Sequence, residues 1–136
     1  MLNRKHIATF CLVALVALAG CRPGQPVYNV NSAAYGATAN ARKPSLGQVE
    51  SAIIRAGAKR GWSFTRIAPG QMEGTTVVRG KHRATVNLAY SREDFSITYK
   101  DSQNLEYDPA TGKIHPNYNS WVSLLEQDIR AEIQGI

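Results

Sequence analysis

Residues 83–99 read Arg-Ala-Thr-Val-Asn-Leu-Ala-Tyr-Ser-Arg-Glu-Asp-Phe-Ser-Ile-Thr-Tyr. Apolar and polar residues alternate on both sides of the polar group at 91–94, which is typical of two β-strands that each have one buried face. A hairpin closed by this four-residue loop pairs Tyr90 with Phe95, Leu88 with Ile97 and Val86 with Tyr99. All of these side chains then lie on one face, whereas a shift of one residue would turn one strand's apolar set toward water. The stretch therefore predicts an antiparallel hairpin of defined register.

Two further strands are expected before this hairpin. Alternation at 62–64 is followed by a Pro-Gly turn at 69–70 and by a run rich in Thr and Val at 71–79. A two-residue turn at Gly80-Lys81 then leads into the hairpin, because glycine accepts the positive φ that such turns need. This turn pairs Val77 with Ala84 and leaves Val78 outside, whereas a bulge would reverse the two. Together these segments predict an antiparallel meander of four strands, with a further short strand at 105–107.

A helix is expected on each side of the strands. Ser45 and Gln48 form a capping-box pattern, and Gly61 supplies a stop. The second helix carries a broad apolar stripe, with a cap at Pro116-Asn117. The stripe consists of Tyr118, Trp121, Val122, Leu125, Ile129 and Ile133. The order helix, four-stranded antiparallel meander, helix predicts an α+β two-layer sandwich with both helices on one face of the sheet.

Length and composition exclude several classes of protein. The chain has 136 residues, of which 43% are apolar and 19% charged, so one domain is expected rather than a disordered or multispan membrane chain. Without the first twenty residues the formal net charge falls from +6 to +4. This mild positive charge favours anionic lipid or cell-wall polymers, and it is too small to indicate a nucleic-acid groove.

The N-terminus has the pattern of an export signal. Arg4 and Lys5 precede an apolar run at 7–19, which is shorter than the roughly 20 residues that span a bilayer. The run ends in Leu18-Ala19-Gly20-Cys21, which resembles a bacterial lipobox. In such signals the cysteine thiol takes a diacylglycerol, the chain is cut before the cysteine, and the new amine is acylated. An ordinary secretory signal and an uncleaved anchor are the alternatives.

Lipidation of Cys21 sets the expected location and organisation. Cys11 is lost with the signal peptide, so the mature chain has no disulfide. By resemblance to the sorting rule of diderm bacteria, Arg22 permits export to the outer membrane, which places the protein on its periplasmic face. We expect a signal peptide at 1–20, the lipidated cysteine and a flexible tether at 21–44, and a globular domain at 45–136.

The second half of the chain resembles a block shared by a family of small, uncharacterised lipoproteins of diderm bacteria. The matching motifs are Phe95-Ser96-Ile97-x-Tyr99, Ser102-x-Asn104-Leu105-x-Tyr107 and Ile114-His115-x-Asn117-Tyr118-Asn119-x-Trp121-Val122. The resemblance spans about 49–133. It implies a location and a domain extent, but it implies no activity or ligand.

Two sets of polar residues are candidates for a site. Extending the hairpin register pairs Ala84 with Asp101, which puts His82 diagonally across from Asp101, and His115 enters from the loop before the second helix. Two imidazoles and a carboxylate can bind zinc or act in acid/base catalysis. A turn role for His82 and a hydrogen-bonded loop role for His115 are the alternative, and the sequence holds no HExxH, GxSxG or catalytic thiol.

The second set consists of amides and a hydroxyl interleaved with aromatic residues, a combination that suits a sugar or peptide ligand. Its members are Ser102, Asn104, Asn117 and Asn119. Local capping and turn closure are the competing interpretation. We expect a non-catalytic binding module of the envelope without metal or other cofactor, with an envelope protein or a wall component as partner. The alternative is a small hydrolase or metal-dependent enzyme that uses His82, Asp101 and His115.

Overall fold

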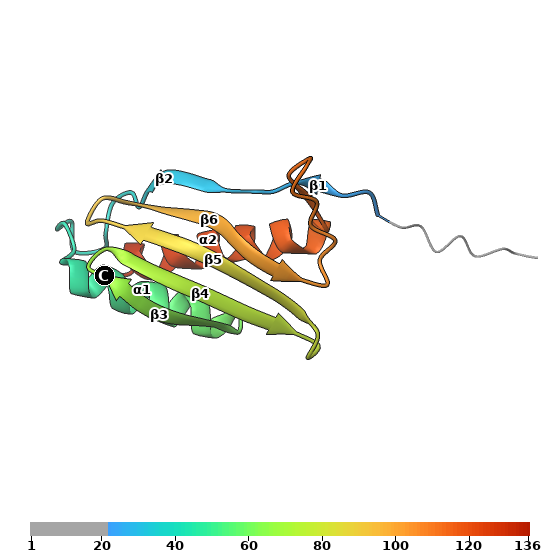
Figure 1. Ribbon diagram of the computed structural model, residues 1–136. Helices are drawn as coiled ribbons and strands as arrows, with labels where there is room; N and C mark the ends of the chain where they lie inside the picture. Colours follow the sequence, from blue (N-terminus) through green and yellow to red (C-terminus); the bar gives the residue numbers. More distant parts are fainter. Residues whose placement is uncertain (1–21) are drawn as a thin grey trace, which may run out of the picture.

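The computed structural model describes residues 22–136 and confirms the α+β fold (Figure 1). The expected signal peptide at 1–20 and Cys21 lie outside the described residues. The strands are β1 (Gln25–Pro26), β2 (Val30–Ala34), β3 (Trp62–Ala68), β4 (Gln71–Val78), β5 (His82–Tyr90), β6 (Asp94–Gln103) and β7 (Lys113–Ile114). The helices are α1 (Leu46–Lys59) and α2 (Pro116–Gln134). Both helices cover one face of an antiparallel sheet of order β2-β6-β5-β4-β3, and β1 pairs with β7 in a small second sheet.

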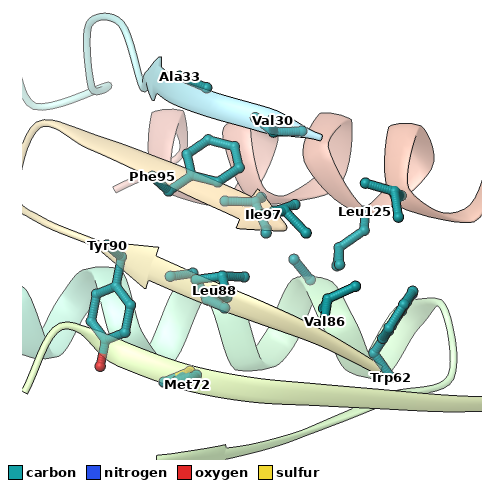
Figure 2. Packing of buried hydrophobic residues seen from close by; sticks show 14 of the residues in the cluster. Val30, Ala33, Trp62, Met72, Val86, Leu88, Tyr90, Phe95, Ile97 and Leu125 are labelled. Carbon is teal, nitrogen blue, oxygen red and sulfur yellow. The ribbon is translucent and has the colours of Figure 1, made fainter. Parts of the chain in front are cut away.

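The β5–β6 hairpin has the expected register over most of its length. Tyr90 faces Phe95, and Leu88 faces Ile97. Figure 2 shows these side chains directed into the layer between sheet and helices, where Leu125 of α2 meets them. The alternating pattern therefore predicts the hairpin correctly, because only this register buries both apolar sets.

Toward the other end of the hairpin the register shifts by one residue. Val86 faces Tyr99 as expected, but Thr85 faces Asp101, so that Lys100 is an extra residue in β6. The expected pairing of Ala84 with Asp101 is therefore wrong, since a β-bulge at this point moves every later partner by one position.

The turn between β4 and β5 also differs from the expected one. Val78 pairs with His82, which leaves three residues in the connection instead of two. Arg79 and Gly80 have φ values of 53° and 68°, the left-handed pair that matches the twist of a tight hairpin. One extra loop residue turns Val77 outward, where it is 48% exposed.

The N-terminal segment is part of the folded domain. β2 pairs with β6 as a fifth strand, and Val30, Ala33 and Tyr35 are buried. A flexible tether over 21–44, and a domain that begins only at 45, are therefore wrong for the described residues. The apolar residues of this segment are few and a register shift with Ser32 at φ 44° breaks their period, so the sequence shows no strand pattern here.

The expected cap at the start of the first helix is confirmed, and the one at the start of the second helix is wrong. α1 begins with the capping box of Ser45 and Gln48. α2 is capped by His115 instead of Asn117, because the His115 Nδ1 atom accepts the Asn117 backbone N–H at 3.1 Å. The strand expected at 105–107 is also absent from the described chain: positive φ at Asn104 and Glu106 breaks the backbone there, and Lys113–Ile114 forms the short strand in its place.

One aromatic side chain determines how closely α1 approaches the sheet. The ring of Phe64 in β3 lies against Gly57 of α1 and Gly74 of β4. A Cβ atom at Gly57 would lie 2.3 Å from this ring, and one at Gly74 would lie 2.5 Å from it. Since contacts this short do not occur, a side chain at either position would require the Phe64 ring or its surroundings to shift.

Candidate functional site

The structure does not bring His82, Asp101 and His115 together as a metal site. His82 Nδ1 lies 2.9 Å from the backbone oxygen of Asn104, to which it donates, and His115 Nδ1 caps α2. Asp101 is exposed on β6, opposite Thr85. Within 22–136, no group of three or more His, Cys, Asp or Glu side chains is arranged to hold a metal ion.

Asn104 joins the end of β6 to the β4–β5 turn. Its φ is 56°, and its Nδ2 donates to the backbone oxygen of Lys81 at 2.7 Å, while its own carbonyl accepts from His82. Asparagine tolerates this left-handed conformation better than most residues do. Asn104 and His82 therefore fix the position of the turn at 79–81.

Ser102 belongs to a cluster of tyrosines at the same end of the sheet. Its Oγ lies 2.9 Å from the Tyr99 hydroxyl. The Tyr99 ring stacks on Tyr107 with 4.3 Å between centroids and meets the edge of Tyr118 at 5.6 Å. Burial is the main cause that raises the pKa of Tyr99, and it also raises the pKa of Tyr118, whose buried hydroxyl has no hydrogen-bond partner among the described residues. These rings fill space in the fold, with only Tyr107 substantially exposed.

Asn119 holds the N-terminal segment against α2. Its Oδ1 accepts from the backbone nitrogen of Tyr28, and its Nδ2 donates to the backbone oxygen of Pro26, both at 2.9 Å. Tyr28 also donates its hydroxyl to Glu126 at 2.7 Å, and this bond is the main cause that raises the Tyr28 pKa. Like Asn104, the candidate contact residue Asn119 therefore binds the chain's own backbone. The side chain of Asn117 is exposed.

A groove lies between this attached segment and the first turns of α2. Its volume is about 670 Å³. It is lined by Gln25, Tyr28, Pro116, Asn119, Ser120, Ser123 and Leu124. Tyr28 and Leu124 are 39% and 36% exposed there, so an aromatic and an aliphatic side chain stand beside hydroxyls and amides. The sequence does not predict this groove, because two of its seven lining residues, Gln25 and Tyr28, belong to a segment that shows no regular pattern.

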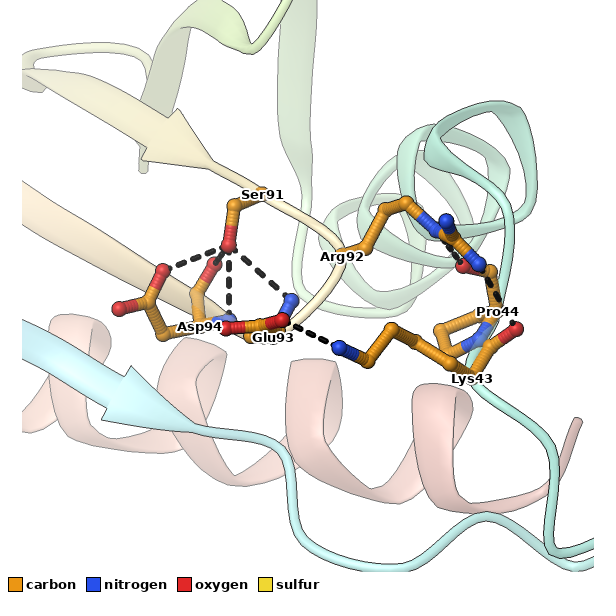
Figure 3. Close-up of polar contacts among 6 residues, drawn as sticks. All are labelled: Lys43, Pro44, Ser91, Arg92, Glu93 and Asp94. Atoms are coloured by element: carbon orange, nitrogen blue, oxygen red, sulfur yellow. Dashed lines mark hydrogen bonds and ion pairs between the residues drawn. The ribbon is translucent and has the colours of Figure 1, made fainter.

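A second hollow, of about 430 Å³, lies at the opposite end of the sheet, over the loop that follows β2. Figure 3 shows Arg92 donating to the backbone oxygens of Pro44, at 2.7 Å, and Lys43. Ser91 Oγ accepts from the backbone nitrogens of Glu93 and Asp94, which closes the β5–β6 turn. The polar groups here tie the loop to the hairpin and are largely occupied.

Comparisons with models of known protein families, with curated proteins and with solved structures found no match to this chain. Among the helices of the described chain, none has the length and apolar character needed to cross a membrane.

Proposed function

We propose that this chain is a lipoprotein of the bacterial cell envelope, acylated on Cys21 and held at the periplasmic face of the outer membrane. The observation that carries the proposal is the sequence around the cysteine. Two basic residues precede an apolar run too short to span a bilayer, and Leu18-Ala19-Gly20 stands directly before Cys21. The resemblance of 49–133 to small lipoproteins of diderm bacteria supports the same proposal.

The folded N-terminal segment changes how such an anchor acts. Cys21 precedes Gln25, the first residue of β1, by four positions. An extended chain covers at most about 3.6 Å per residue, so the lipidated residue lies within about 14 Å of the domain. Two or three acyl chains make this attachment effectively stable. The protein therefore acts at the membrane surface, without the long reach of a flexible tether.

The domain itself is proposed to be a non-catalytic binding module. Its partner would be an envelope protein or a component of the wall polymer. The groove beside α2 supports this, because it places the Tyr28 ring and the Leu124 side chain next to the hydroxyls of Ser120 and Ser123. Apolar surface with a few polar groups is the usual lining of a site for a sugar or peptide. No specific observation favours the enzyme alternative, since His82 and His115 each use Nδ1 within the fold.

Fatty-acid labelling in cells tests the anchor. Cells fed an alkyne fatty acid should incorporate it into the wild-type chain and into the Cys11→Ser variant, which keeps the proposed lipidation site. The Cys21→Ser variant should incorporate none, because the thiol that accepts the diacylglycerol is missing. An unlabelled wild-type chain, or equal labelling of both variants, would refute the proposal.

A further inference from the structure

One end of the molecule combines the start of the described chain with several loops. β1, the β4–β5 turn, the segment between β6 and β7, and the first turn of α2 all lie at this end, while the C-terminus lies at the other (Figure 1). A lipid on Cys21 would be joined to this end through residues 22–24 alone. The anchor proposed above would therefore hold this end near the bilayer.

Within the described chain, the basic residues at this end form no ion pairs, whereas most basic residues elsewhere do. They are Arg22, Arg79, Lys81, Arg83 and Lys113, and none forms an ion pair with another residue of the described chain. Elsewhere in the described chain most basic side chains form ion pairs with carboxylates, and the exceptions are Arg42 and Arg92. Those that do are Lys43, Arg55, Lys59, Arg60, Arg66, Lys100 and Arg130. Positive charge at the first end is thus free to meet an external anion.

The acidic residues at the same end are fewer and do not cancel this charge. They are Asp101, Glu106 and Asp108. Asp108 accepts from the Thr111 hydroxyl and the Ala110 backbone nitrogen, and these bonds lower its pKa. No acidic residue occurs between Gly74 and Arg92, the stretch that contains the β4–β5 turn. The turn is therefore the most uniformly basic part of this end.

The β4–β5 turn presents its charges on a fixed support. Arg79, Lys81 and Arg83 are exposed, and Asn104 holds the turn through the Lys81 carbonyl. His82 adds a bond to the Asn104 carbonyl. Both bonds run to Asn104, so the backbone that carries the three side chains has a fixed position relative to the end of β6.

We propose that this basic end, with the β4–β5 turn at its tip, lies against the anionic headgroups of the leaflet that holds the anchor. The inference rests on the proposed lipidation of Cys21. Residues 22–24 keep Gln25 within about 14 Å of Cys21, less than two Debye lengths of about 8 Å at physiological ionic strength. The end therefore stays within the field of the headgroups, which attracts Lys and Arg side chains. The domain then has one preferred orientation, with β1 and the turn toward the bilayer and the C-terminus away from it.

Energy transfer to the bilayer tests this orientation. The acylated protein, purified from membranes, would carry a donor dye on either Val77→Cys or Ile67→Cys. Val77 is 48% exposed near the tip, and Ile67 is 61% exposed near the other end of the sheet. The acceptor is a headgroup-labelled lipid in vesicles of equal parts phosphatidylcholine and phosphatidylglycerol, with phosphatidylcholine vesicles for comparison.

Charge variants make the test specific. The tip variant replaces the three basic residues of the turn and carries the changes Arg79→Asn/Lys81→Gln/Arg83→Gln. Asparagine is used at position 79 because it tolerates the positive φ there. The control Arg42→Gln/Lys43→Gln/Arg66→Gln removes the same charge from residues outside the basic end. We expect higher transfer from position 77 than from 67 in the anionic vesicles. This excess should shrink in the tip variant and in phosphatidylcholine vesicles, where only the anchor holds this end near the bilayer, and it should persist in full in the control.

The outcomes separate the orientation from the anchor. If the protein floats with vesicles at high salt but energy transfer is equal from positions 77 and 67, the orientation is overturned and the anchor stands. The same holds if energy transfer is alike in the tip and control variants. Protein that does not float at high salt refutes the anchor, and the inference fails with it.

Discussion

The two edge strands of the main sheet are attached in different ways. β3 follows α1 and is joined to β4 by the turn at 69–70, and its Phe64 ring packs between the glycines at 57 and 74. β2 meets β6 across more than sixty residues of chain, as in the bond from the Ser32 nitrogen to Ser96 Oγ, 64 positions away. One edge is formed between sequence neighbours, and the other depends on distant parts of the chain.

Polar side chains of α2 hold the β2 edge. Arg130 donates to the backbone oxygen of Ala34, and Gln134 Nε2 donates to that of Tyr35 at 2.9 Å. Asn119 adds its two bonds to the segment before β2. We therefore expect the β3 edge to be sensitive to side-chain volume and the β2 edge to be sensitive to hydrogen bonding. The proposed lipid anchor on Cys21 would be attached to the β2 side, the edge that should open more easily.

The largest expected effect is at the β3 edge. Gly57→Ala would place a methyl group 2.3 Å from the Phe64 ring, and overpacking of this kind should lower the free energy of unfolding by about 3 kcal/mol. Gly47→Ala is the matched control in the same helix, since nothing lies within 4 Å of a Cβ there, and should raise stability by about 0.5 kcal/mol. Urea unfolding measures both. Equal stability of the two variants would show that the ring does not set the distance between α1 and the sheet.

A smaller, local effect is expected at the β2 edge. Asn119→Ala removes the bonds to Tyr28 and Pro26, which should cost about 1–2 kcal/mol, equivalent to roughly tenfold faster hydrogen exchange at 25–30. Exchange in β3 and β4 should stay as in the wild type. Asn117→Ala, two positions earlier in α2, should change neither region because its side chain is exposed. Faster exchange throughout the domain would mean that both edges open together.

The smallest expected change in stability comes from the ion pairs between α1 and α2. Lys59 and Arg55 hydrogen-bond Glu132 and lower the pKa of its carboxyl. A lowered pKa means that the pair stabilises the fold above the carboxyl's ordinary pKa and that this contribution is lost as the pH falls through the lowered value. Glu132→Gln should therefore cost about 0.5 kcal/mol at pH 7 and almost nothing in acid.

Thermal unfolding across pH measures the Glu132→Gln effect. Asp101→Asn is the control, because Asp101 is exposed and forms no ion pair with another described residue. If the difference in stability between the wild type and Glu132→Gln does not shrink in acid, the stabilisation by Glu132 does not come from its ion pairs.

Local patterns predict the parts of this fold that depend on nearby residues. The β5–β6 register and the Ser45 capping box follow from alternation and spacing within a few residues. The bulge at Lys100 and the pairing of β2 do not, because neither leaves a periodic signal. The same limit applies to the candidate site: the polar residues were identified, but Asn104 and Asn119 bind backbone that is distant in sequence.

The central claim is that a lipid on Cys21 holds the folded domain directly at a membrane. Intact mass spectrometry of the natural protein tests it most directly. The claim predicts a chain that begins at Cys21 and carries the added mass of a diacylglycerol and an amide-linked acyl group. A chain that retains residues 1–20, or that begins elsewhere without acyl mass, would contradict it.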